Sequence, residues 1–83
     1  MTEIIRFGDI KRGDTFVHKP FVGEEQILEV TRVIKRDNLD LGGTVIRAFN
    51  PKTGEYVRQL HRSNNDVEKI SSINPETGEI VYP

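Results

Sequence analysis

Two arginines and two aromatic residues have the types and spacing in this sequence that best suit binding chemistry. They flank the turn Asn50-Pro51-Lys52-Thr53-Gly54-Glu55, whose Asn, Pro and Gly favour a tight chain reversal. With Pro51 to Gly54 as the loop, a hairpin register places Phe49 opposite Tyr56 and Arg47 opposite Arg58. A side-chain period of two puts all four on one face of the hairpin. Such a face can hold phosphate or carboxylate with its guanidinium groups and stack bases on its rings.

The facing arginines present an electrostatic problem that a partner would relieve. Like charges directly opposite each other destabilise a strand pair by up to about 1 kcal/mol. A bound polyanion such as nucleic acid would offset this cost. The alternative is that each arginine lies over a neighbouring ring or pairs with Glu29 or Glu55, with the aromatic residues covering the end of a barrel. Basic residues expected to contact phosphates at the periphery are Arg32, Lys35, Arg36 and Arg62.

A loop predicted after the first strand carries Phe21 and Val22, apolar residues with no evident role in a turn. One interpretation is a docking loop for a protein partner, as in an adaptor or inhibitor. The alternative is that Phe21 folds back and covers the core. The net charge of −1 and an acidic segment at 66–79 favour a protein partner over nucleic acid.

Catalytic and metal-binding patterns are weak. His18 and His61 stand 43 positions apart and alternate with apolar residues, which is typical of half-buried or solvated histidines. No nucleophile elbow, phosphate-binding loop or metal-ligand spacing occurs. Asp37, Asn38 and Asp40 superficially resemble a calcium loop, but their periodicity is wrong. We therefore expect a non-enzymatic binding module with no catalytic residue, metal or cofactor.

Length and composition limit the class of protein. The 83 residues form one predicted domain, 1–83, with 35% hydrophobic and 30% charged residues. The absence of cysteine favours a cytoplasmic setting, and no apolar run approaches a membrane span. Positive charge is concentrated at 26–62, where seven Lys/Arg stand against four Asp/Glu. Nothing in the sequence indicates an oligomeric state.

The elements that must position these residues are short strands. Patterns rich in β-branched and aromatic residues predict strands at 15–18, 26–36, 44–49, 56–62, 70–73 and 79–82. A second turn, Asn74-Pro75-Glu76-Thr77-Gly78-Glu79, repeats the first, and residues 67–70 suit a single helical turn. In the 26–36 strand, strict alternation places Arg32 on the same face as Leu28 and Val30.

The order of these elements resembles that of an SH3-like barrel. The opening Ile10-x-x-Gly13-Asp14-x-Phe16, the long loop, the middle hairpin and the helical turn before a terminal strand carry the resemblance. It implies an all-β, partly closed small barrel of five or six antiparallel strands with one short helical turn. An open β-sandwich and an OB-like barrel are the alternatives.

Overall fold

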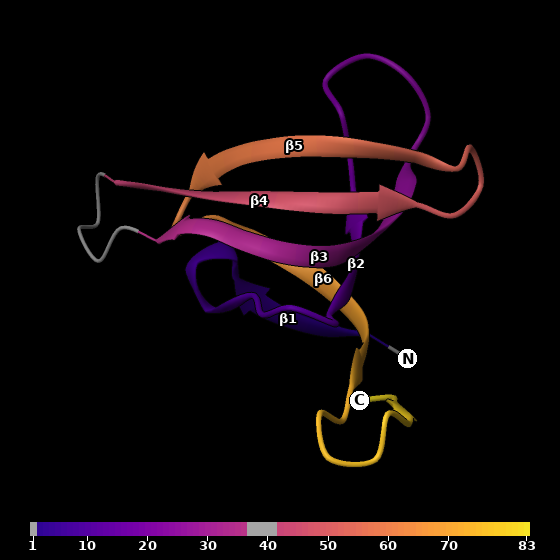
Figure 1. Ribbon diagram of the computed structural model, residues 1–83. Helices are drawn as coiled ribbons and strands as arrows, with labels where there is room; N and C mark the ends of the chain where they lie inside the picture. Colours follow the sequence, from indigo (N-terminus) through magenta and orange to yellow (C-terminus); the bar gives the residue numbers. More distant parts are fainter. Residues whose placement is uncertain (1, 37–41) are drawn as a thin grey trace.

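A computed structural model describes residues 2–36 and 42–83 as an all-β fold built from antiparallel strands (Figure 1). Its elements, in chain order, are β1 (Glu3–Arg6), the 3₁₀ turn η1 (Phe7–Asp9), β2 (Thr15–His18), β3 (Gln26–Arg36), β4 (Gly43–Asn50), β5 (Glu55–Arg62), β6 (Asp66–Ile73) and β7 (Ile80–Val81). Neighbouring strands follow the order β1-β6-β2-β3-β4-β5, and β7 pairs with β6. No helix in the described ranges is long and apolar enough to cross a membrane.

The expected strands form, but the helical turn lies elsewhere. Residues 67–70 belong to β6, because Val67 pairs with Ile5 of β1 while Lys69 pairs with both Glu3 and Phe16. Pairing on both edges of β6 outweighs the local preference for a turn. The 3₁₀ turn instead comprises residues 7–9, directly after β1, a strand that the sequence pattern did not predict.

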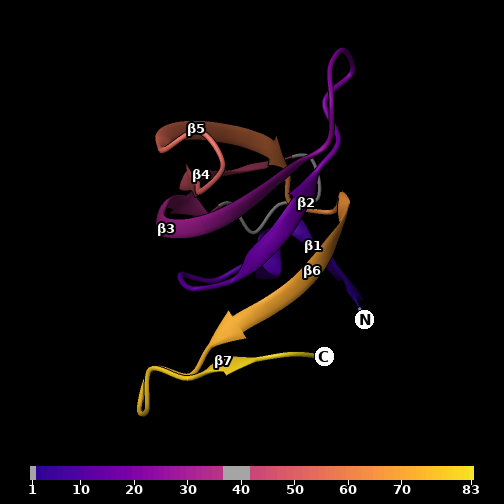
Figure 2. The ribbon, with the colours of Figure 1, turned by 90° about the vertical axis from the view of Figure 1, so that its right-hand side faces the viewer.

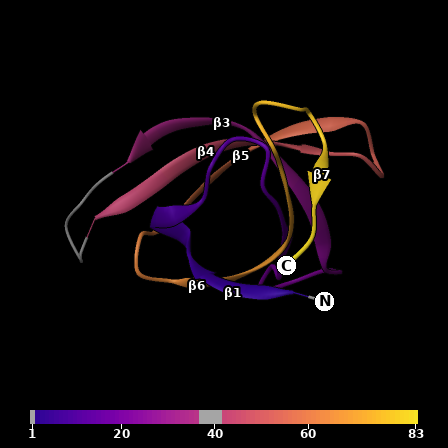
Figure 3. The ribbon, with the colours of Figure 1, turned by 90° about the horizontal axis from the view of Figure 1, so that it is seen from below.

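The sheet curls round the core without closing, as the view from below shows (Figure 3). β1 and β5 are the two ends of the strand path and do not pair with each other. The all-β, antiparallel class expected from the sequence is confirmed, but the SH3-like barrel is not.

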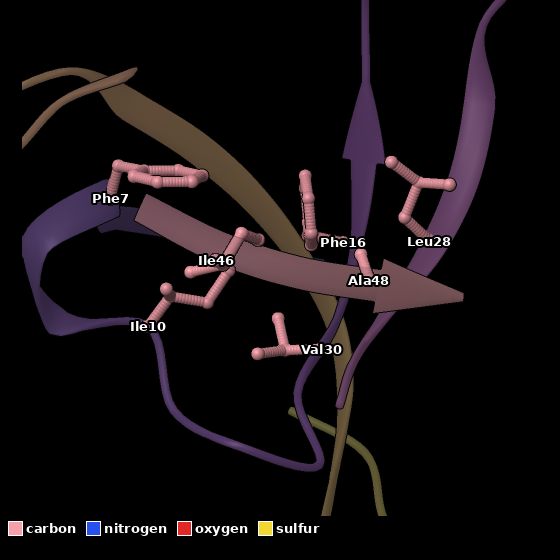
Figure 4. Packing of buried hydrophobic residues seen from close by; sticks show 7 residues of the cluster. All are labelled: Phe7, Ile10, Phe16, Leu28, Val30, Ile46 and Ala48. Carbon is pink, nitrogen blue, oxygen red and sulfur yellow. The ribbon is translucent and has the colours of Figure 1, made fainter. Parts of the chain in front are cut away.

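The core lies inside this curl and is small (Figure 4). Phe7 and Phe16 meet edge to face, with ring centroids 6.1 Å apart. Burial of each large apolar side chain contributes roughly 1.5–3 kcal/mol to folding. The buried cluster consists of Phe7, Ile10, Phe16, Leu28, Val30, Ile46 and Ala48.

The two repeated turns have the same internal structure. Asn50 Oδ1 accepts a 3.0 Å hydrogen bond from the Lys52 amide, and Asn74 Oδ1 accepts one of 2.9 Å from Glu76. Gly54 and Gly78 have φ of 75° and 74°, in the left-handed region that glycine tolerates. The first turn joins two long strands, whereas the second joins β6 to the short β7 and projects from the domain (Figure 2).

Candidate functional site

Arg47 and Arg58 lie directly opposite each other in the β4–β5 ladder, as the turn predicts. The same register pairs Phe49 with Tyr56. Both arginines are exposed. Arg47 stands between the buried Ile46 and Ala48, so its side chain points away from the core, and Arg58 opposite it lies on the same face. The hairpin face expected from the sequence is therefore confirmed as an outer surface of the sheet.

A third arginine joins this pair from β3. The β3–β4 register shifts between Val30 and Arg32, so that Arg32 pairs with Arg47 instead of facing inward. The extra residue in this β-bulge is Thr31, whose hydroxyl donates a 3.0 Å hydrogen bond to the Arg47 carbonyl oxygen. Strict alternation, which puts Arg32 on the same face as Val30, fails at this bulge. Instead, the exposed side chains of Arg32, Arg47 and Arg58 form one row across three strands, which we call the arginine row.

Within the described part of the chain, the arginine row forms no ion pair with an acidic side chain. The guanidinium carbon of Arg47 lies 4.8 Å from the centroid of the Tyr56 ring, and that ring is 5.0 Å from the ring of Phe49. The alternative interpretation from the sequence thus holds for Arg47, which lies over a ring. Among the described residues, neither a ring nor a carboxylate offsets the charge of Arg58 or Arg32.

The rest of the outer face of β3–β5 is mixed basic and apolar. Lys35 pairs with Val45, and the exposed Arg62 pairs with Gly43. Gly43 leaves room for Leu60, since a Cβ there would lie 2.7 Å from Leu60 Cδ1. The side chain of Arg36, also expected at the periphery, lies outside the described part. We call this surface the basic face; its residues are Glu29, Arg32, Lys35, Val45, Arg47, Phe49, Tyr56, Arg58, Leu60 and Arg62.

Phe21 does not cover the core. Its side chain is 105% exposed, and Val22 is 83% exposed, at the tip of the loop between β2 and β3. This loop projects beside the turn between β4 and β5 (Figure 1), where Lys52 Nζ lies 4.0 Å from Glu24 Oε2. The apolar loop tip is therefore a free surface in the described structure.

The two histidines meet, which the sequence did not predict. Their ring centroids are 5.6 Å apart, and the ring of His61 also lies 4.8 Å from that of Phe7. Both line an open cavity of about 360 Å³, together with Phe16, Asn65 and Glu68. These contacts connect β5, one end of the strand path, to β2 and η1 through side chains. The sequence showed only that His18 and His61 alternate with apolar residues. It did not show that their strands lie close together, because that follows from the topology.

Burial favours the neutral form of both imidazoles. Desolvation lowers the pKa of His18, and desolvation followed by repulsion from His18 lowers the pKa of His61. His61 Nε2 lies 2.7 Å from Gln59 Oε1 and donates to it in the matching tautomer. Glu68 is held by Lys19, with Nζ 2.9 Å from Oε1.

Among residues 2–36 and 42–83, no three histidine or acidic side chains gather in a way that could hold a metal ion. Asp37, Asn38 and Asp40, which superficially resemble a calcium loop, lie outside the described residues. No protein-family model matches the sequence, and neither a curated protein nor a solved structure matches it. The arginine row and the adjacent ring pair are therefore the arrangement on which a function can be argued.

Proposed function

We propose that this protein binds single-stranded nucleic acid through the basic face. The observation that carries the proposal is the arginine row, three exposed guanidinium groups on adjacent strands without a carboxylate partner among the described residues. Adjacent like charges cost stability in the free protein, and a phosphate backbone offsets that cost on binding. Guanidinium groups also match phosphate oxygens with paired hydrogen bonds.

The aromatic pair favours a single strand over a duplex. Tyr56 is 58% exposed and lies beside Phe49, in the next row of side chains along β4 and β5 from the arginine row. Unpaired bases can stack on such rings, and stacking contributes about 1–3 kcal/mol per base. Bases in a duplex are already stacked and present only their edges in the grooves. The face therefore suits one strand whose phosphates follow the arginines while a base contacts Tyr56.

Half of the carboxylates in the acidic segment 66–79 lie away from the basic face. Glu76 and Glu79 belong to the turn between β6 and β7, on the side of the molecule away from β4 and β5 (Figure 1), whereas Asp66 and Glu68 belong to β6. The net charge of −1 is a sum over the whole chain, and the cations of the basic face are separated from the carboxylates of this turn. Local positive potential, not net charge, determines attraction at distances near the Debye length.

An NMR titration tests the proposal. Labelled protein is mixed at low ionic strength with a single-stranded oligonucleotide of mixed sequence and, separately, with its duplex. We expect amide signals of Arg32, Arg47, Tyr56 and Arg58 to shift with the single strand at lower concentration than with the duplex. Unmoved signals at these four residues would overturn the proposal. Lys11→Gln is the control variant, since Lys11 is exposed outside β3–β5.

A second candidate function is docking of a protein partner by the loop between β2 and β3. The observation that favours it is the full exposure of Phe21 at the loop tip. The protein would then act as an adaptor or inhibitor, in the cytoplasmic setting that the absence of cysteine favours. Affinity purification from the source cell tests this function. One stoichiometric partner, resistant to nuclease and lost with Phe21→Ser, supports it, whereas recovery of nucleic acid alone contradicts it.

A further inference from the structure

Residues 72–82 form a projecting segment, which we call the C-terminal arm. It exposes apolar side chains that the domain does not cover. It is held by two residue pairs, Ser72 with Val81 and Ile73 with Ile80. Ile80 and Tyr82 are 58% and 67% exposed. A two-stranded ribbon of this kind is marginally stable alone and gains from packing against another surface.

The charge of the arm is the opposite of that of the basic face. The arm contains Glu76 and Glu79 and no lysine or arginine. Neither carboxylate forms an ion pair within the described part of the chain. The basic face has five cations against Glu29, with the exposed Tyr56 and Leu60 beside the arginines. The two surfaces are therefore complementary both in charge and in apolar character.

The arm lies away from the arginine row of its own molecule. It leaves the domain at the end of β6, on the side opposite β4 and β5, in both side views (Figures 1 and 2), and its Asn74 and Pro75 line a cavity with Glu29 of β3. Docking of an arm on the arginine row would then join two copies. Because each copy has one arm and one face, two copies that exchange arms form a closed twofold dimer, whereas one-way docking grows head to tail.

We propose that the C-terminal arm of one copy docks on the basic face of a second copy. Glu76 and Glu79 then lie among the arginines, and Ile80 and Tyr82 contact Leu60 and the aromatic pair. This inference uses the surface of the proposed function but does not require nucleic acid to bind. If both hold, a docked arm occupies the surface that nucleic acid needs, and self-association competes with binding.

Sedimentation equilibrium without nucleic acid provides the first test. We expect the weight-average mass to rise above the 9.5 kDa monomer as concentration increases from about 10 µM to about 1 mM at low salt. Raising the ionic strength to about 0.5 M should return the mass towards that of the monomer, because salt screens exposed charges. A constant monomer mass at low salt, or association that salt does not weaken, would overturn the inference.

Two complementary variants give the sharper test. Glu76→Lys with Glu79→Lys alters the arm alone, and Lys52 at the matching position of the first turn shows that this turn accommodates lysine. Arg47→Gln with Arg58→Gln alters the face alone. Each variant should be monomeric by itself, while their equimolar mixture forms a 1:1 heterodimer through the one intact arm and the one intact face. A mixture that stays monomeric, or variants that still self-associate singly, would contradict arm-to-face docking.

The mixture also separates this inference from the proposed function. The arm variant retains the whole basic face and should bind single-stranded oligonucleotide at least as tightly as the original protein. Loss of self-association with retained oligonucleotide binding supports both proposals. Heterodimer formation without oligonucleotide binding supports the docking inference and rejects the proposed function.

Discussion

Arg47 and Arg58 lie directly opposite each other on the outer face of the sheet, and neither forms an ion pair within the described ranges. In the described part of the chain, local compensation is seen for Arg47 alone, from the ring of Tyr56 at 4.8 Å. A cation over an exposed ring contributes about 0.5–1 kcal/mol, similar in size to the repulsion between two facing like charges. The facing pair thus adds little or nothing to the free energy of unfolding. A third arginine, Arg32, continues the row.

Replacing one member of the pair should stabilise the protein. Arg58→Glu converts a repulsive pair into an attractive one, and we expect the free energy of unfolding to rise by about 0.5–1 kcal/mol in urea denaturation. The same variant should lose affinity for single-stranded nucleic acid. Arg58→Gln, which removes the repulsion without adding attraction, should show about half of the stability gain. A fall in stability for both variants would contradict this account of the pair.

The ring of Tyr56 should contribute to binding through stacking. Tyr56→Ala removes the ring, and we expect the Kd for a single-stranded oligonucleotide to rise about 30-fold, near the middle of the range for one stacked base. Tyr56→Phe retains the ring and should bind like the original protein. Fluorescence anisotropy measures both. Equal affinity for Tyr56→Ala and Tyr56→Phe would mean that no base stacks there.

The two similar turns should differ in their effect on stability. Gly54→Ala and Gly78→Ala each force a side chain into the left-handed region, at a cost of about 1–2 kcal/mol. Gly54 joins β4 to β5, so its substitution should lower the global free energy of unfolding by that amount. Gly78 belongs to the C-terminal arm, which pairs through two residues only, so the arm should open locally instead.

Hydrogen exchange distinguishes the two outcomes. With Gly78→Ala, amide protection should fall within residues 72–82 and stay unchanged in β3 and β4. With Gly54→Ala, the most protected core amides should exchange faster. Equal loss of global stability in the two variants would show that the arm unfolds together with the domain.

The histidine pair should make stability depend on pH. Burial lowers the pKa of His18 and of His61 below the ordinary value near 6.5, so the unfolded chain binds these protons more readily. The stability from the neutral pair is complete above about pH 6.5 and decreases as the pH falls through 6.5 towards the lowered folded-state values. Urea denaturation between about pH 7 and pH 5 measures this slope. The double variant His18→Gln, His61→Gln should flatten it, and an unchanged slope would assign the effect to other groups.

Much of the hairpin could be predicted because its determinants are local. The Asn-Pro-Lys-Thr-Gly-Glu turn fixes the register from Asn50 and Glu55 outwards, and that register decides that Arg47 faces Arg58. The same local chemistry predicted the turn at 74–79 and a terminal hairpin.

Features that depend on distant pairing were not predictable. The bulge at Thr31, which brings Arg32 to the outer face, depends on the pairing of β3 with β4 and has no marker in the β3 sequence alone. Residues 67–70 became strand because β1 and β2 pair with them from both sides. The contact of His18 with His61 follows from the curl of the sheet, and no spacing in the sequence encodes it.

The central claim, that the arginine row holds the phosphates of a single strand, is tested most directly by the salt dependence of binding. Each phosphate contact to a single strand contributes about −0.7 to the slope of log K against log salt, so three arginines predict a contribution of about −2. We expect the triple variant Arg32→Gln, Arg47→Gln, Arg58→Gln to lose this part of the slope, while Lys11→Gln retains it. Binding with the same slope in the triple variant, or no salt-dependent binding by the original protein, would contradict the claim.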